Sequence, residues 1–306
     1  ERYGQIVNMN TKNNELISII VPCFNSGEKL SRALDSIINQ TWLRKEIILV
    51  NDGSTDKYTL EIINKYKENR IITVINQINL GLPSARNEGV YYSKGNYLYF
   101  LDSDDWIEPD ALCLMYMTIK ANKDSSFIFS DSILEGDVKK VIRREYNLFE
   151  QLFLNQIPYS IFISKKTWNK CGGYDVNMKL GYEDWELNLR LGSHGKFGRR
   201  LSKPIFHYNV SCSGMLISKS SKFHAQIINY IINKNSDLYS FNNIFKLWKR
   251  WRKVPSSYPL IFYFPWYLII KTMPISLVTK IFIFGRNFKW FFTRNDFLNH
   301  LKVFLF

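Results

Sequence analysis

The chain has 306 residues, of which 46% are hydrophobic and 22% are charged, and its formal net charge is +14. This length allows a sizeable buried core, and this composition excludes a disordered chain. The four cysteines form no C-x-x-C pair, so neither a structural zinc site nor a disulfide framework is indicated. Residues 1–15 are polar and carry no signal-peptide pattern.

Four continuous apolar runs, rich in β-branched residues, predict buried strands over residues 16–22, 46–52, 71–75 and 97–102. Helical spacing of apolar residues predicts helices between them, over residues 28–39, 57–69 and 83–93. Strands that alternate with helices indicate an α/β fold, with a mostly parallel sheet flanked by helices. Farther along, the pattern predicts a hairpin around residues 135–136, a short helix that stops at the glycine pair 172–173, and a helix from about Asp184 to residue 192 or 195.

Acidic residues follow two of the predicted strands. Asp52 lies in N-D-G-S-T-D, and Asp102 begins D-S-D-D. Ligands bind beyond the carboxyl ends of parallel strands, so both turns are expected at one rim of the sheet. Asp102 and Asp104 are spaced to hold Mg²⁺ or Mn²⁺ together with diphosphate oxygens. The alternative is ordinary turn chemistry with Asp105 as a helix cap, but the position beside a second acidic turn favours a metal site.

Three further segments have both a functional and an ordinary explanation. Asp52 is placed to accept a hydrogen bond from a nucleobase, or it belongs to a turn in which Ser54 or Asp56 caps the next helix. Arg86 follows a helix start and suits a diphosphate, or it is a surface residue of an amphipathic helix. Asp184, at a helix start, is stabilised as an anion that accepts a proton, or it is a simple N-cap.

Five segments appear together in this order: SIIVPCFNSGEKLSRALDSIINQT, IILVNDGSTD, NLGLPSARNEG, YLYFLDSDDWIEPDAL and GYEDWELNLRL. As a set they resemble the family 2 glycosyltransferases of the GT-A fold, over roughly residues 16–215. The resemblance implies a polar segment 1–15, a catalytic domain 16–215 and a helical tail 216–306. Within the catalytic domain it implies a nucleotide-binding half, 16–105, and an acceptor half, 106–215.

The resemblance also implies roles for individual residues. The nucleotide would be bound by Pro22, Phe24, Asn25, Glu28, Asp52, Arg86, Asp102 and Ser103. Asp102 and Asp104 would meet the ribose and a diphosphate bridged by Mn²⁺ or Mg²⁺. Asp184 would be the general base, with Glu183 as its partner or as the less favoured base. Trp185 would form a wall of the acceptor site.

The chain departs from the family pattern after the base helix. Such enzymes often carry Tyr-Arg-x-His there, whereas this chain has FHYNVSCSG, with Asn209 and Ser211 at the Arg and His positions. His207 is expected to be a structural residue at a strand end, so metal coordination would rest on Asp104 and the diphosphate. No Q-x-x-R-W run follows the base helix, which favours the addition of a single sugar.

The positive charge gathers at the end of the chain. Residues 241–306 hold eleven Lys or Arg and one acidic residue, so they carry +10 of the net charge of +14. Basic and aromatic residues alternate there, and the longest uncharged run, 254–270, contains three prolines. We expect the tail to lie on a membrane surface rather than to span it. The alternative is that its helices pack on the catalytic domain or on a second subunit.

These observations together predict a metal-dependent, inverting glycosyltransferase of the hexosyltransferase type. It would transfer one sugar from a nucleotide-diphosphate sugar, a UDP-sugar by resemblance, to a hydroxyl of a saccharide acceptor. The tail suggests a lipid-linked acceptor, surface glycan or polysaccharide synthesis, and a peripheral position on the cytoplasmic face of a membrane. Nucleic acid is not an expected partner, because no recognition module accompanies the basic residues. The alternatives are a metal-dependent nucleotidyltransferase and a non-catalytic nucleotide-binding scaffold.

Overall fold

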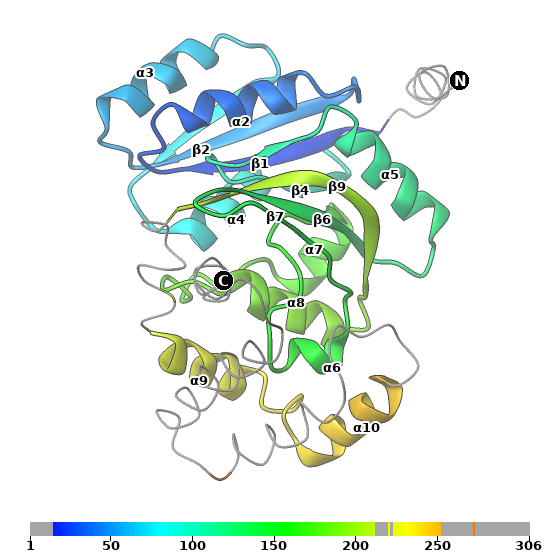
Figure 1. The fold of residues 1–306 in the computed structure, drawn as a ribbon. Helices are drawn as coiled ribbons and strands as arrows, with labels where there is room; N and C mark the ends of the chain where they lie inside the picture. Colours follow the sequence, from blue (N-terminus) through cyan, green and yellow to red (C-terminus); the bar gives the residue numbers. More distant parts are fainter. Residues whose placement is uncertain (1–14, 212–219, 221–222, 252–271, 273–306) are drawn as a thin grey trace.

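A mixed β-sheet runs through the centre of the computed structural model, which describes residues 15–211, 220, 223–251 and 272 (Figure 1). The strands of this sheet are β1 (Ile17–Cys23), β2 (Lys45–Asp52), β3 (Ile72–Gln77), β4 (Tyr97–Phe100), β5 (Trp106–Ile107), β6 (Phe127–Gly136), β7 (Lys140–Ile142), β8 (Phe162–Ser164) and β9 (Gly198–Val210). Their order is β3-β2-β1-β4-β8-β6-β9-β5, and β7 pairs with residues 132–134 of β6.

The helices connect these strands and then extend beyond them. They are α2 (Lys29–Ile38), α3 (Lys57–Tyr66), α4 (Leu82–Tyr92), α5 (Ala111–Ala121), α6 (Leu148–Gln151), α7 (Lys165–Cys171), α8 (Glu183–Ser193), α9 (His224–Lys234) and α10 (Phe241–Trp251). In Figure 1, α2 and α3 lie on one face of the sheet, and α4, α7 and α8 lie on the other. α9 and α10 lie beyond α8, away from the sheet.

The first half of the sheet matches the predicted α/β pattern. β3, β2, β1 and β4 are parallel neighbours, and every residue of β1 is buried, as expected for an apolar run covered on both faces. The second half is mixed. β8 is antiparallel to β4 and β6, whereas the long β9 is parallel to β6 and antiparallel to β5. The acidic turn after β4 therefore lies where the parallel half meets the mixed half.

Two hydrophobic cores flank the helix α8. The larger core surrounds the sheet and includes Leu187 and Leu191 of α8. The second core includes Trp185 and Leu189 of the same helix, together with apolar residues of α6, α9 and α10. The helix that carries the predicted base is thus packed from both sides.

The part of the tail that the structure describes packs on the catalytic domain. Ile227 and Ile231 of α9, and Ile244 of α10, are buried in the second core beside α8. One face of α9 and of α10 thus packs as the alternative for the C-terminal helices requires, while Phe241 and Phe245 of α10 stay exposed. The uncharged run 254–270 and the polar segment 1–14 lie outside the described residues. Within the described ranges, no helix combines the length and the apolar character that a bilayer crossing requires.

Candidate active site

Asp52 ends β2 and holds the loop that leads into α4. Its Oδ1 accepts hydrogen bonds from Gln77 Nε2 at 2.7 Å and from the backbone N–H of Leu80 at 2.8 Å, and its Oδ2 accepts from the Gly81 N–H at 3.0 Å. Gly81 is the N-cap of α4 and has φ of 95°, a conformation that favours glycine. Asp52 therefore positions the start of α4, while its contact with a nucleobase stays a prediction.

Short polar side chains tie the loops after β1, β2 and β4 into one rim. Asn25 Oδ1 accepts hydrogen bonds from the backbone N–H groups of Thr55 and Asp56, at 2.8 and 2.9 Å. The hydroxyls of Ser26 and Ser103 lie 2.5 Å apart. The two acidic turns thus meet at the same edge of the sheet, as expected for the carboxyl ends of parallel strands.

The other residues assigned to the nucleotide differ in accessibility. Pro22 is buried in β1, whereas the Phe24 ring is 51% exposed at the rim. Glu28 is exposed at the start of α2, and its Oε1 accepts a hydrogen bond of 3.4 Å from the Tyr58 hydroxyl. Asp56 caps α3 by accepting from the Thr59 N–H at 2.8 Å, as its alternative role requires. Nucleotide contacts at Pro22, Phe24 and Glu28 stay predictions.

Arg86 joins the acidic turn after β4 to the start of α8. It is only 1% exposed. Its Nη2 donates to both carboxylate oxygens of Asp102, at 2.7 and 3.0 Å, and its Nη1 donates to Glu183 Oε1 at 2.6 Å. Arg86 is therefore committed to these two acids in this structure, and its contact with a nucleotide stays a prediction.

Two tyrosines that no motif had singled out enclose this guanidinium. Its central carbon lies 4.7 Å from the ring centroid of Tyr159 and 5.1 Å from that of Tyr174. The Tyr159 hydroxyl donates to Asp105 Oδ2 and accepts from the backbone N–H of Asp102 at 2.8 Å. Asp105 is thus a buried partner of Tyr159. The alternative that Asp105 is a helix cap is wrong, because Asp110 is the N-cap of α5.

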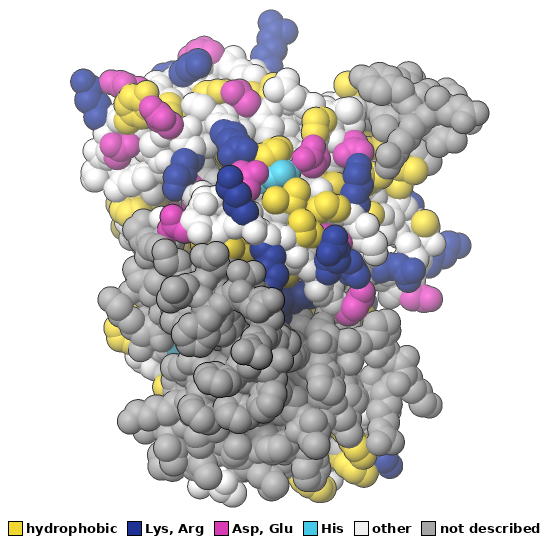
Figure 2. All heavy atoms as spheres, viewed as in Figure 1, with side chains coloured by type: hydrophobic (Ala, Val, Ile, Leu, Met, Phe, Trp, Pro, Cys, Tyr) yellow, Lys and Arg dark blue, Asp and Glu magenta, His cyan; other side chains and the backbone are white. Residues whose placement is uncertain are grey.

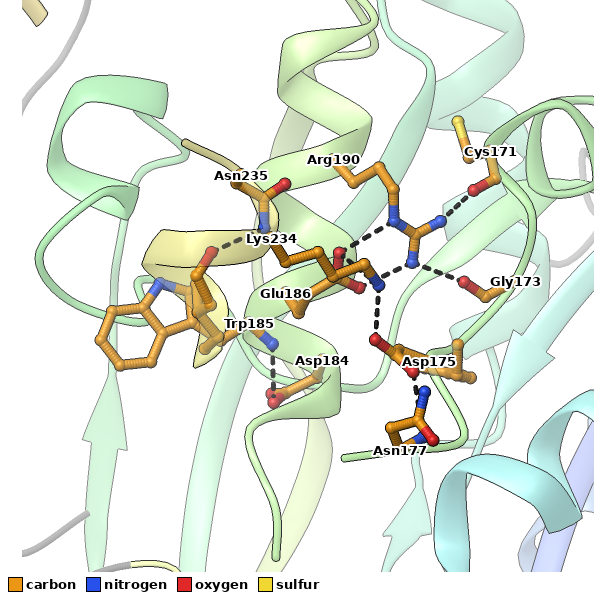
Figure 3. A network of polar contacts seen from close by, with 12 residues as sticks. Cys171, Gly173, Asp175, Asn177, Asp184, Trp185, Glu186, Arg190, Lys234 and Asn235 are labelled. Carbon is orange, nitrogen blue, oxygen red and sulfur yellow. Dashed lines mark hydrogen bonds and ion pairs between the residues drawn. The ribbon is translucent and has the colours of Figure 1, made fainter. Parts of the chain in front are cut away.

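Asp184 and Glu183 open α8 and have different partners. Asp184 Oδ1 accepts from the backbone N–H of Trp185 at 2.8 Å, as Figure 3 shows, and Oδ2 accepts from Asn155 Nδ2 at 2.8 Å. Glu183 is paired with Arg86. Of the two acids, Asp184 is the one with no ion pair to a cation in the described part of the chain, so it is better placed to take a proton.

Trp185 lies in the interior of the second core. Its side chain is 3% exposed, and its Nε1–H donates to the backbone carbonyl of Gln151 at 2.5 Å. The structure therefore shows a residue that anchors α8 to α6. Its predicted role as a wall of the acceptor site stays a prediction, which this burial does not favour.

Burial and neighbouring charges shift the pKa values of the acids in the site. Burial raises the pKa of Asp102 to about 6, although the Arg86 guanidinium acts in the opposite direction. Burial also raises the pKa values of Glu183 and Asp184; the Asn155 hydrogen bond to Asp184 and the Arg86 charge oppose this. The negative charge of Asp102 contributes to the raised pKa of Asp184. The acidic turn after β4 and the predicted base thus interact electrostatically.

The oxygen atoms around Asp104 suit a hard divalent cation. Asp104 Oδ2 accepts a long hydrogen bond of 3.3 Å from Asn209 Nδ2, which leaves much of this carboxylate available. Among the described residues, no group of three or more His, Cys, Asp or Glu side chains is arranged to hold a metal. Mg²⁺ typically takes one or two protein carboxylates and completes its coordination with phosphate oxygens and water. Asp104, with Asp102 beside it, fits that donor set.

His207 has a carboxylate on each ring nitrogen. Nδ1 lies 2.9 Å from Glu135 Oε1, and Nε2 lies 2.8 Å from Glu108 Oε1. The imidazole also stacks on Trp106, with ring centroids 3.3 Å apart. These contacts match the structural role expected for His207, since both nitrogens are engaged by the protein.

Charged side chains of both signs are interspersed on the face of the molecule drawn in Figure 2. Lys and Arg side chains are spread over its described part, with Asp and Glu among them. No single basic patch forms within the described surface in this view.

The comparisons with known proteins agree with this geometry. A family model described as "Glycosyl transferase family 2" matches residues 18–180. The chain is 30% identical to a hyaluronan synthase of Pasteurella multocida over 73% of its own length and 24% of that protein. It is 32% identical to the glycosyltransferase GlyA of Streptococcus pneumoniae over 68% of its own length and 31% of that protein. The chain thus spans between a quarter and a third of these curated relatives.

Solved structures share the fold. The S. aureus protein TarS (residues 1–349), crystallised with UDP-GlcNAc, superimposes with a TM-score of 0.58 and 20% sequence identity, covering 71% of this chain and 66% of that one. By its sequence motifs, its family match and its GT-A fold, the chain belongs to glycosyl transferase family 2.

Proposed function

We propose that the chain is an inverting, metal-dependent glycosyltransferase that transfers one sugar from a UDP-sugar to a hydroxyl of a saccharide acceptor. One observation carries the proposal. The buried Arg86 joins Asp102, in the turn that would hold the donor diphosphate, to Glu183, the neighbour of the base Asp184. The acids of the donor turn are therefore joined to the residue that directly precedes the base.

The choice of donor rests on the relatives and on the rim. TarS has been crystallised with UDP and with UDP-GlcNAc. In this chain, the exposed Phe24 and Glu28 lie at the rim formed by the loops after β1, β2 and β4. An exposed aromatic ring beside polar side chains is suited to a nucleobase. The N-terminus of α4, fixed by Asp52, adds backbone dipoles that favour an anion.

A divalent cation would be held by Asp104, with Asp102 beside it, and by the diphosphate of the donor. When bound, it would neutralise negative charge on the leaving nucleoside diphosphate. The chain's own contribution there is to hold Asp102 in place. Arg86 binds both oxygens of this carboxylate, and the Tyr159 hydroxyl accepts from its backbone N–H.

Asp184 would remove the proton from the acceptor hydroxyl as that oxygen attacks the anomeric carbon. The bond from this carbon to the diphosphate breaks as the new glycosidic bond forms. A single base, with no second nucleophile assigned, accounts for inversion. Glu183 is the weaker candidate for the base, because its carboxylate is committed to Arg86.

The acceptor half, 106–215, would supply the acceptor site, and the nucleotide-binding half, 16–105, would supply the donor site. We propose a saccharide acceptor, lipid-linked, in surface glycan or polysaccharide synthesis. The curated relatives include synthases of hyaluronan and chondroitin, which are polysaccharides. Addition of a single sugar is proposed because the chain lacks the Q-x-x-R-W run.

The test compares Asp184→Asn with Asp124→Asn, a control at an exposed turn. UDP release from UDP-GlcNAc and other UDP-sugars is measured with Mn²⁺ and a panel of saccharide acceptors. Donor binding is measured by calorimetry. Asp184→Asn should lower turnover by a factor of about 10² to 10⁴ and spare donor binding. The control should behave as wild type.

The outcomes separate the alternatives. Near-normal turnover by Asp184→Asn would show that the base is misassigned. Pyrophosphate release from a nucleoside triphosphate, without sugar transfer, would indicate a nucleotidyltransferase. Tight binding of UDP-sugars without turnover, across the acceptor panel, would indicate a scaffold.

We further propose that the C-terminal part rests on the cytoplasmic face of a membrane. On α10, Phe241 and Phe245 are 65% and 43% exposed, and Lys246 and Lys249 are also exposed. Aromatic and cationic side chains on one short helix suit the headgroup region of an anionic bilayer. Sedimentation with vesicles tests this: binding to anionic but not to neutral vesicles is expected. Equal recovery in the supernatant with both would contradict it.

A further inference from the structure

Two side-chain amides lead from the core to the carboxylate of Asp184. The Gln151 Nε2–H donates to Asn155 Oδ1 at 2.9 Å, and Asn155 Nδ2–H donates to Asp184 Oδ2 at 2.8 Å. Gln151 is fully buried at the end of α6. No sequence motif pointed to Gln151 or Asn155.

A backbone N–H on the far side of Gln151 fixes the orientation of both side-chain amides. The backbone N–H of Gln156 donates to Gln151 Oε1 at 3.0 Å. Because a backbone N–H is only a donor, Gln151 must turn its oxygen to it and its NH₂ toward Asn155. Asn155 must then turn its oxygen toward Gln151 and its NH₂ toward Asp184. The backbone of Gln156 thereby decides that Asp184 meets a donor.

The charged groups that face Asp184 come from several elements. Arg86 of α4 and the Asn155 donor favour its ionised form, whereas burial and the charge of Asp102 disfavour it. Glu183 of α8 is an acidic neighbour whose own pKa is affected by Asp184. Tyr174 and Tyr208 also lie within its electrostatic reach. Since Arg86 is bound to two other acids, Asn155 supplies the one side-chain hydrogen bond recorded to Asp184 among the described residues.

We propose that Asn155 is a positioning residue, which holds the Asp184 carboxylate ionised and aimed at the acceptor, and that Gln151 sets the direction of its amide. This rests on the proposed function, in which Asp184 is the base. This relay of hydrogen bonds, from the Gln156 N–H through Gln151 to Asn155, ends in one N–H that is directed at Asp184 Oδ2, so it opposes protonation at that oxygen. Within the described part of the chain, the other oxygen, Oδ1, accepts only from the N–H of Trp185.

The segment that carries the relay has other anchors. Trp185 Nε1–H binds the carbonyl of Gln151, and the Tyr239 hydroxyl donates to the carbonyl of Leu152 at 2.8 Å. These contacts use backbone atoms, so they survive a change of the Asn155 side chain. The Asn155→Ala variant is therefore expected to fold.

The first test measures the protonation of Asp184 in the free protein by isotope-edited infrared titration. The signal is assigned by its loss in Asp184→Asn. In Asn155→Ala the titration of Asp184 should move up by about one to two pH units, because hydrogen bonds to charged groups are the stronger ones. Asn155→Ser, which can place a hydroxyl donor in the same direction, should recover part of the shift. An unchanged titration in a folded Asn155→Ala variant overturns the proposal.

The second test reverses the orientation of the Asn155 side-chain amide. Gln151→Glu replaces the donor facing Asn155 by an oxygen, so the Asn155 amide is expected to flip and to present its oxygen to Asp184. This variant should shift the titration upward at least as far as Asn155→Ala does. Gln151→Met, which removes the relay donor without imposing a flip, is the matched control and should give a smaller shift. Equal shifts in both variants contradict the assigned role of Gln151.

Kinetics separate this inference from the proposed function. Asn155→Ala should lower kcat at neutral pH by roughly tenfold and move the acidic limb of the pH profile upward, with the donor KM unchanged. If Asp184→Asn abolishes turnover while Asn155→Ala leaves kcat and the limb unaltered, the positioning role fails alone. If Asp184→Asn itself stays active, the proposed function fails.

Discussion

Arg86 of α4 and Glu183 of α8 form a buried ion pair of 2.6 Å, although 97 residues separate them in the sequence. The same guanidinium binds Asp102. Removing it leaves the buried Glu183 and the partly buried Asp102 without their cation, so Arg86→Met should lower the free energy of unfolding by about 3–5 kcal/mol. Arg32→Met is the matched control, because the Arg32 side chain is 59% exposed and its loss should cost at most about 1 kcal/mol. Urea denaturation measures both; equal losses would contradict the prediction.

The acids of the site should make stability depend on pH. The pKa of Asp102 is raised to about 6 in the folded protein. A raised folded pKa contributes stability below the unfolded value, about 4, and that contribution is lost as the pH rises through 6. Asp102→Asn cannot titrate, so the stability of wild type relative to this variant should fall by up to about 3 kcal/mol between pH 4 and pH 7. Denaturation without donor or metal, at several pH values, checks this; a difference that does not vary with pH would refute it.

Lys234 attaches α9 to the catalytic part of the chain. Its Nζ lies 2.6 Å from Asp175 Oδ2 and 3.1 Å from Glu186 Oε1, within the network drawn in Figure 3. Glu186 is fully buried, and it keeps a second cationic partner, Arg190, when Lys234 is replaced. Lys234→Met should therefore cost about 1–3 kcal/mol and speed hydrogen exchange in α9.

The control for Lys234 is Lys57→Met. Lys57 is 91% exposed and makes only a 3.7 Å pair with Glu61, so its loss should leave stability nearly unchanged. Protection of α9 that is identical in wild type and Lys234→Met would argue against this attachment.

Asn209 offers a way to probe the proposed metal site. Its Nδ2 lies 3.3 Å from Asp104 Oδ2, so Asn209→Asp places another carboxylate beside Asp104. Repulsion should lower the melting temperature of the metal-free variant, and Mn²⁺ alone should restore it. Wild type should need UDP together with Mn²⁺ for a comparable rise. Thermal shift measures both, with Asn122→Asp at the end of α5 as the control; a variant that does not respond to Mn²⁺ would count against a cation at Asp104.

Local sequence patterns predicted the parallel half of the fold. The apolar runs around β1, β2, β3 and β4 need no distant partner to be recognised, because their composition alone fits a buried strand. Gly172, with φ of 78°, ends α7 as its position after the helical pattern indicated. The hairpin of β6 and β7 was also predicted, around Glu135 and Gly136.

The mixed half of the sheet could not be predicted from local sequence patterns. β5 and β8 have two and three residues, too few to show a period. β9 contains Pro204 and several charged residues, and its register against β6 shifts near Asp131. Such a strand is stabilised by its neighbours more than by its own sequence.

The candidate site, like the fold, could be predicted only in part. The roles of Asp102, Asp104 and Asp184 stay predictions. Motifs singled out these residues as candidates, because acidic turns after two strands and an acidic helix start occur together in this chain. They did not identify Tyr159 or Asn155, which act through contacts with residues distant in sequence. Nor did they show that Arg86 would be enclosed by protein.

The position of α8 between two cores limits how far the chain can be shortened. Deleting residues after 223 would strip Ile227, Ile231 and Ile244 from the second core, which also holds Trp185 and Leu189 of α8. A unit that keeps this core complete therefore includes Ile244 of α10, well past the 18–180 span by which the family is recognised. Truncations designed on that span alone would end before α8 begins and would lose Asp184 itself.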